Sequence, residues 1–181
     1  MFELETRRLL LRDFIDSDWQ IILSLSSEPR VTRWQDYLPE ASEARCREWV
    51  SEFIVHNSER PRFAYNLSII LLSTGEKIGW VGWGHASDKR IGDRDFGYAI
   101  VPAHWNKGYM TEAMVAVLAY IFAEDDANSV FGECDALNHG SSGVMKKAGM
   151  HLVREWEEER ADGRTYPMHR YLISRSQRVG R

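Results

Sequence analysis

The chain has 181 residues, of which 44% are hydrophobic and 28% are charged, and its formal net charge at pH 7 is −4. This composition is typical of a globular protein, and the acidic balance provides no broad basic surface for nucleic acid or for an anionic membrane. No apolar run approaches membrane-spanning length, and the N-terminal residues lack a signal-peptide core. We therefore predict a single cytoplasmic domain over residues 1–181.

The cysteines and histidines bear on disulfides and metal sites. Cys46 and Cys134 lie in no metal-ligand spacing, and two cysteines are too few for a disulfide framework. The six histidines form no HxH or HxxxH pair. The sequence therefore predicts a reducing compartment and no metal.

The first part of the chain predicts one strand followed by two helices. Residues 7–14 end in alternating apolar and charged residues, as a strand does. Residues 16–18, Asp-Ser-Asp, can cap a helix that follows directly. After a break at Pro39, residues 42–55 carry an apolar stripe and predict a second helix.

The middle of the chain is rich in strand signals. Residues 65–72 and 77–85 are largely apolar runs, separated by the turn residues Ser-Thr-Gly-Glu at 73–76. They predict an antiparallel hairpin. Another turn is expected at 88–92, followed by a strand at 95–101.

The last part of the chain predicts two helices and three strands. A well-buried helix is expected after Gly108, because its apolar residues recur at i, i+3, i+4 and i+7 and also occupy other faces. A strand at 128–135 and a helix at 138–148 follow, and residues 152–159 and 166–174 predict a hairpin. This order of elements predicts a mixed α/β or α+β fold.

The segment DFGYAIVPAHWNKGYMTE, residues 95–112, is the most informative of the chain. A strand-like run ends at Pro102, the loop 105–108 follows, and the long helix begins. The free N–H groups and positive dipole end of that helix are directed out of the loop, and Gly108 permits a phosphate to approach the backbone. By itself the segment indicates either an anion site or an ordinary strand-to-helix connection.

Several phrases in order and spacing resemble the GNAT superfamily of acyl-CoA-dependent N-acyltransferases, and within it the RimJ/RimL group of ribosomal-protein N-terminal acetyltransferases. They are LETRRLLLR at 4–12, DFGY at 95–98, WNKGYMTEA at 105–113, Asn138 and Ser141 followed by KAGM at 147–150, and the final hairpin. The resemblance covers nearly the whole chain. It implies an α+β fold whose mostly antiparallel sheet is splayed between its fourth and fifth strands and flanked by helices. Asn106 stands where this family usually has Gly, and Met110 where it has a small residue.

The resemblance also implies acetyl-CoA as co-substrate. Its pantetheine arm would pair with the backbone of Ala99, Ile100 and Val101, for which a plain strand is the alternative. The Asn138 side chain would reach the same arm, although an N-cap needs no ligand. The pyrophosphate would take backbone N–H groups from Asn106, Lys107, Gly108, Tyr109, Met110 and Thr111.

Asp95 and Ser141 are the catalytic candidates. Asp95 lies on a central strand, where a carboxylate would deprotonate the amine directly or through water, whereas an ion pair with Arg94 or Arg90 is the alternative. The resemblance places the Ser141 hydroxyl near the thioester sulfur, where it would assist the leaving thiolate. The alternative for Ser141 is a solvated helix serine.

We expect an N-acetyltransferase that moves an acetyl group to a primary amine by direct attack in a ternary complex. A protein N-terminal amine is the first acceptor to consider. The alternatives are a small-molecule amine, amino-acid or antibiotic acetyltransferase, and a non-catalytic acyl-CoA-binding module. The sequence leaves the oligomeric state open, a homodimer included. The aromatic residues expected near the acceptor are Trp34, Tyr37, Trp83 and Tyr166, although most aromatics at such positions are core residues.

Overall fold

The computed structural model describes residues 1–35, 38–86, 93–124, 126–160 and 162–178. The strands are β1 (Glu3–Glu5), β2 (Leu9–Asp13), β3 (Ala64–Leu71), β4 (Lys77–His85), β5 (Arg94–Ile100), β6 (Ser129–Asp135), β7 (His151–Glu159) and β8 (Thr165–Ser174). The α-helices are α1 (Trp19–Ser26), α2 (Pro29–Thr32), α3 (Glu43–Ser58), α4 (Tyr109–Glu124), α5 (His139–Lys147) and α6 (Arg175–Arg178). Two short 3-10 helices, η1 (Asp16–Asp18) and η2 (Pro102–His104), precede α1 and the loop before α4.

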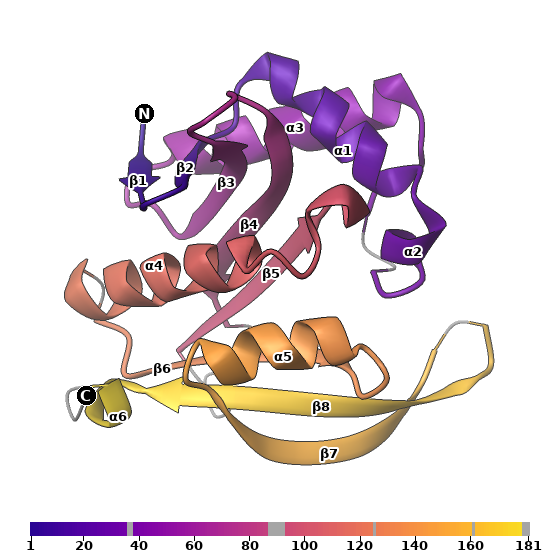
Figure 1. Ribbon diagram of the computed structural model, residues 1–181, viewed down its shortest axis with the longest axis vertical. Helices are drawn as coiled ribbons and strands as arrows, with labels where there is room; N and C mark the ends of the chain where they lie inside the picture. Colours follow the sequence, from indigo (N-terminus) through magenta and orange to yellow (C-terminus); the bar gives the residue numbers. More distant parts are fainter. Residues whose placement is uncertain (36–37, 87–92, 125, 161, 179–181) are drawn as a thin grey trace. The chain divides into compact units, whose positions relative to one another are not determined.

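Within the described residues, eight strands form one sheet in the order β1-β2-β3-β4-β5-β6-β8-β7. Neighbours pair antiparallel from β1 to β4 and from β6 through β8 to β7. The β5 and β6 strands are parallel, with Arg94 opposite Val130 and Asp95 opposite Phe131. The predicted α+β fold, a mostly antiparallel sheet flanked by helices, is confirmed (Figure 1).

The described residues group into two compact units, one of residues 1–84 and 97–109 and the other of residues 85–96 and 110–181. The single domain predicted over 1–181 stays a prediction. In the first unit, α1 packs on α3 and α3 packs on β3 (Figure 1). Ile22, Leu25 and Cys46 are fully buried between these elements. Burying a large aliphatic side chain stabilises a fold by roughly 1.5–3 kcal/mol.

A buried carboxylate, that of Asp18, forms ion pairs at the start of α1. Asp18 is fully buried and forms ion pairs with Arg12 at 2.6 Å and with Lys77 at 2.8 Å. Burial pushes its pKa upward, but the hydrogen bonds from Arg12, Lys77 and the Ile15 backbone outweigh burial, so the pKa lies below its ordinary value. Asp18 directly precedes α1, but its side chain accepts no hydrogen bond from the N–H groups of that helix. It accepts the Ile15 N–H instead, so residues 16–18 hold a buried ion-pair network in place of the predicted side-chain cap.

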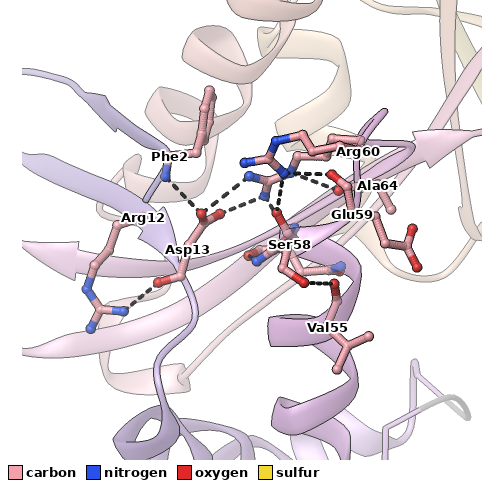
Figure 2. A network of polar contacts seen from close by, with 11 residues as sticks. Phe2, Arg12, Asp13, Val55, Ser58, Glu59, Arg60 and Ala64 are labelled. Carbon is pink, nitrogen blue, oxygen red and sulfur yellow. Dashed lines mark hydrogen bonds and ion pairs between the residues drawn. The ribbon is translucent and has the colours of Figure 1, made fainter.

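A second polar network joins the N-terminal residues to the segment after α3. The Asp13 carboxylate accepts the Phe2 N–H at 2.8 Å (Figure 2). It also accepts from the Arg62 guanidinium at 2.6 Å. Asn57 Oδ1 accepts from Arg62 at 2.6 Å and from the Asn66 N–H at 3.0 Å. The carboxylate and amide oxygens are thereby satisfied, and the network joins β2, the end of α3 and β3.

The elements outside the sequence predictions include the strand β1 and the helix α2. The strand predicted at 7–14 is β2, and β1 pairs with it through Leu4 opposite Leu11. The helix α2 begins with Pro29, and the Glu28 side chain caps it by accepting the Arg30 N–H at 3.1 Å. Both elements are too short to show the periodicity on which the predictions rest. The turn predicted at 88–92 lies outside the described residues.

In the second unit, β8 pairs with β6 on one side and β7 on the other, and α5 packs on β6 and β8 (Figure 1). The helix α4 is largely buried from Met110 to Phe122, as its periodicity predicts. Gly149 ends α5 with a φ of 94°, a conformation that favours glycine. Gly132 leaves space for the Phe96 ring, because an added Cβ would lie 2.2 Å from that ring and would force it to shift.

Candidate functional site

The loop before α4 has an unusual backbone in the first unit. Asn106 and Gly108 both have positive φ, at 59° and 78°. Alternation of left-handed with other residues turns successive N–H groups toward one side and forms an anion-binding concavity. Asn is among the non-glycine residues that enter this region most readily, which explains how it replaces the usual glycine. Asn106, Lys107 and Gly108 are all exposed, so the loop is open to a ligand.

An arginine distant in sequence lies on this loop. Arg8 Nη1 donates to the Lys107 carbonyl at 3.0 Å, and the guanidinium lies 4.4 Å from the centre of the Tyr109 ring. Arg8 Nη2 is 3.5 Å from where a Cβ on Gly108 would be. Arg8 is not among the predicted site residues, because no local pattern connects residues 99 positions apart.

The helical turn η2 holds the other side of the loop. His104 is buried, and its Nε2 lies 2.9 Å from a carboxylate oxygen of Glu76. Its ring centre is 5.9 Å from that of Tyr109. Trp105 Nε1 donates to the Ile100 carbonyl at 2.6 Å. The loop is therefore held by contacts with the turn between β3 and β4, with the end of β5 and with the first residue of α4.

At the end of β5, the backbone N–H and carbonyl groups of successive residues point alternately toward β4 and away from it. The Val101 N–H bonds to the Ile78 carbonyl at 2.9 Å, and the Ala99 carbonyl lies so close to Gly79 that an added Cβ would be 2.2 Å away. The carbonyls of Tyr98 and Ile100 instead accept side-chain donors, from Gln35 and Trp105. Ala99 and Val101 thus face β4. Three residues, Ala99, Ile100 and Val101, are predicted to pair with pantetheine. Ile100 is the one of these whose backbone groups face away from β4.

Asn138 caps α5 in the second unit. Its Oδ1 accepts the Ser141 N–H at 3.1 Å, so the capping role offered by the sequence is present. The preceding turn is fixed by Asp135, whose carboxylate accepts the Leu137 N–H at 2.8 Å. Among the described residues, no acceptor bonds to Asn138 Nδ2. A ligand contact of Asn138 stays a prediction, with Nδ2 as the available donor.

Two serines of α5 lie on a buried thiol. Ser142 Oγ is 3.4 Å from Cys134 Sγ. Burial raises the pKa of the Cys134 thiol, although hydrogen bonds from Ser142 and Ser141 lower it in part. Cys134 is therefore a thiol rather than a thiolate at neutral pH, and like Cys46 it is free and buried. The Ser141 side chain, half-buried, lies beside this thiol at the start of α5.

Asp95 is half-buried on β5, opposite Phe131 of β6. Burial raises the pKa of its carboxyl group, and the negative charge of Glu133 raises it further. Arg94 instead contacts His85 Nδ1 at 3.0 Å and the Asp93 carbonyl at 2.8 Å. Across the described ranges Asp95 forms no ion pair, and Arg90 lies outside them. A carboxylate whose pKa is raised is a stronger base than an exposed aspartate.

The four aromatic residues predicted near the acceptor have different environments. Trp34 is half-buried, with the Arg33 guanidinium 4.2 Å from its ring centre. Trp83 is only 3% exposed and its ring stacks on Tyr65, which gives it a core role. The Tyr166 hydroxyl donates to Asp162 at 2.7 Å, a bond that raises the pKa of the tyrosine. Tyr37 lies outside the described residues.

The described part of the chain also bears on membrane-spanning helices and on metal sites. None of its helices is long and apolar enough to cross a membrane. No group of three or more His, Cys, Asp or Glu side chains within it is arranged to hold a metal ion.

Comparisons with known proteins agree with this geometry. A sequence model of the Acetyltransferase (GNAT) domain matches residues 8–151. The protein named Uncharacterized N-acetyltransferase YnaD, of Bacillus subtilis (strain 168), is 31% identical over 149 residues, which are 80% of this chain and 80% of that protein.

Two solved structures share the fold. RimL, a ribosomal L7/L12 alpha-N-protein acetyltransferase in complex with coenzyme A, matches with a TM-score of 0.80 at 15% identity, over 96% of this chain and 98% of that one. The spermidine N-acetyltransferase of Vibrio cholerae, in complex with CoA and spermine, matches with a TM-score of 0.79 at 18% identity, over 97% and 100%. The domain match covers most of the chain and a relative of more than 30% identity spans most of it. The chain therefore belongs to the GNAT acetyltransferase family and is an acyltransferase enzyme.

Proposed function

We propose that this enzyme transfers the acetyl group of acetyl-CoA to a primary amine by direct attack in a ternary complex. The observation that carries the proposal is the loop before α4, where Asn106 and Gly108 both adopt left-handed conformations. Such a loop offers several backbone N–H groups to one anion, as a pyrophosphate requires. A plain strand-to-helix connection needs no pair of left-handed residues.

The phosphates of the co-substrate are assigned to this loop and the first turn of α4. The backbone of Asn106, Lys107, Gly108 and Tyr109 supplies donors, and Met110 and Thr111 continue the series. The Met110 side chain is 5% exposed and packs in the core, so its contribution is its backbone N–H alone. The positive end of the α4 dipole favours the same anion.

The pantetheine arm is assigned to the edge of β5 that faces away from β4. Ile100 presents its backbone there, whereas Ala99 and Val101 shape the strand from the β4 side. Asn138 Nδ2 donates to a carbonyl of the arm while its Oδ1 keeps the α5 cap. One side chain thus serves both roles that the sequence indicated.

Acetyl-CoA supplies an activated thioester, so the protein needs no covalent nucleophile. Asp95 accepts a proton from the amine, directly or through water, because its raised pKa suits it to that task. The amine nitrogen bonds to the thioester carbon and the carbon–sulfur bond breaks. The Ser141 hydroxyl donates a hydrogen bond to the departing thiolate, which ends as the CoA thiol after taking up one proton.

The acceptor we propose is a protein N-terminal amine, because the phrases at 4–12, 95–98 and 105–113 resemble the RimJ/RimL group. Solved structures of the same fold are named for a ribosomal-protein acceptor and for spermidine, so the fold alone does not select between a protein and a small amine. A polyamine is therefore the second candidate acceptor.

The test measures binding and turnover separately. CoA at 100 times its dissociation constant is expected to stabilise the native state by about 2.7 kcal/mol, which a melting curve detects. Free thiol released from acetyl-CoA is then followed with spermidine and with a pentapeptide that has a free N-terminal amine. Stabilisation by CoA without thiol release from either probe would contradict the enzymatic proposal and favour a binding module. Absence of stabilisation would contradict the assigned CoA site.

A further inference from the structure

Gln35 connects the segment after α2 to the strand edge that we assign to the pantetheine arm. Its N–H bonds to the Thr32 carbonyl at 3.1 Å, which continues the helical turn of α2. Its side-chain Nε2 donates to the backbone carbonyl of Tyr98 on β5. This contact spans 63 positions of sequence and belongs wholly to the first unit. Gln35 thus lies at the edge of β5 that faces away from β4.

The orientation of the Gln35 amide follows from this bond. A carbonyl can only accept, so the group on Tyr98 must be the amide nitrogen. The amide oxygen, Oε1, therefore points elsewhere. It is buried, and among the residues that the structure describes it has no hydrogen-bond partner. A buried acceptor without a donor is unfavourable, so a donor is expected in the working state of the protein.

The chemistry of the reaction supplies such a donor. A primary amine brings N–H groups to the strand segment where the thioester is attacked, and Tyr98 directly precedes the residues assigned to that segment. We propose that Gln35 positions the acceptor amine, with Nε2 on the Tyr98 carbonyl and Oε1 accepting one N–H of the amine. This inference rests on the proposed function. Gln35 is not among the site residues predicted from the sequence, although its neighbour Trp34 is.

The Tyr98 bond makes Gln35 suited to this role. A free glutamine side chain would lose rotamer freedom on binding an amine, whereas Nε2 on Tyr98 already fixes the amide plane. The lone pairs of Oε1 are then held in a fixed orientation. An amide oxygen accepts from an ammonium or a neutral amine alike, so the contact persists as the amine loses its proton.

The test compares the wild type with Gln35→Met, which keeps the length and removes both polar atoms. Gln35→Leu serves as a second apolar variant, and Gln20→Met, at an exposed position of α1, is the matched control. Melting temperature, CoA affinity by calorimetry and thiol-release kinetics are measured, with spermidine and the pentapeptide as probes. We expect the KM for the amine to rise about tenfold to a hundredfold in both Gln35 variants. CoA affinity should stay within twofold, and Gln20→Met should match the wild type.

The other outcomes each overturn the proposal in a distinct way. Weaker CoA binding with an unchanged amine KM would identify the donor as an amide N–H of the pantetheine arm. Unchanged kinetics in folded Gln35→Met and Gln35→Leu would show that the Tyr98 bond is structural alone. No turnover by the wild type with either probe would refute the proposed function together with this assignment. Wild-type turnover with unaffected variants would refute Gln35 alone.

Discussion

Arg8 and Lys107 are joined by a hydrogen bond of 3.0 Å from the guanidinium Nη1 to the Lys107 carbonyl, across 99 positions of sequence. The bond orients the carbonyl toward Arg8, so it faces away from any anion held by the neighbouring N–H groups. The guanidinium also brings a positive charge to the loop, beside the Tyr109 ring. Arg8 therefore both shapes the proposed phosphate site and favours its ligand.

The first prediction is that Arg8→Met weakens CoA binding. A hydrogen bond involving a charged group contributes enough for a loss of about tenfold or more in affinity. Calorimetry with CoA measures it, and Arg7→Met is the control, because Arg7 is the exposed neighbour. Equal affinities for the two variants would remove Arg8 from the site.

Gly108 provides a second prediction. An added Cβ would meet Arg8 at an ordinary contact distance of 3.5 Å, so the cost of Gly108→Val arises from its φ of 78°. A left-handed L-residue costs about 1–2 kcal/mol. Gly75→Val is a matched control, since Gly75 has a φ of 71° and open space around it in the turn between β3 and β4.

Both glycine variants should lose similar stability in a denaturant titration, whereas only Gly108→Val should lose CoA affinity. Asn106→Gly should keep CoA affinity, because glycine adopts the φ of 59° without strain. A Gly108→Val protein with wild-type CoA affinity would contradict the backbone cradle.

The third prediction separates chemistry from binding at Asp95. Asp95→Asn should lower kcat by roughly 10²–10⁴-fold with nearly unchanged CoA affinity, as expected for loss of a general base. Thiol-release kinetics and calorimetry measure the two effects. Turnover equal to that of the wild type at neutral pH would leave water or substrate as the base.

The raised pKa of Asp95 also fixes the sign of a pH effect. The folded protein holds this proton more tightly than the unfolded chain, so the stabilising contribution is present at low pH and is lost as pH rises through the raised pKa. At neutral pH, Asp95→Asn should therefore melt at or above the wild-type temperature. The acid limb of the activity profile should move to lower pH in Glu133→Gln, since the neighbouring negative charge is removed. A lower melting temperature for Asp95→Asn would contradict the buried, unpaired carboxylate.

Asn138 allows its two roles to be separated in a fourth prediction. Asn138→Asp keeps an oxygen to accept the Ser141 N–H, so the α5 cap and the melting temperature should be retained. It removes the Nδ2 donor and adds a charge, so affinity for acetyl-CoA should fall. Ser42→Asp is the control, because Ser42 caps α3 through the Arg45 N–H and should tolerate aspartate without loss of affinity. Retained affinity in Asn138→Asp would leave capping as the whole role of Asn138.

The sequence by itself determined most of the secondary structure. The sequence predicts a strand at 77–85, and β4 has those bounds; the helix predicted after Gly108 begins at Tyr109. These elements carry their own signals, a period of two or of 3.6 and the turn residues at their ends, which act over a few positions. The family phrases were readable for the same reason, since each is a short run in which spacing is preserved.

Tertiary structure alone decided which atoms meet. Alternation along β5 is a sequence property, but only pairing with Ile78 and Gly79 shows that Ala99 and Val101 face β4 while Ile100 faces the other edge. Trp83, an aromatic expected near the acceptor, is instead a core residue stacked on Tyr65.

Arg8 on Lys107 and Gln35 on Tyr98 likewise join residues with no local relation. Hydrogen bonds and burial depend on distances in space, and chain folding sets those distances through the packing of whole elements. Propensity and periodicity describe neighbours along the chain, so they do not predict distances between residues far apart in sequence.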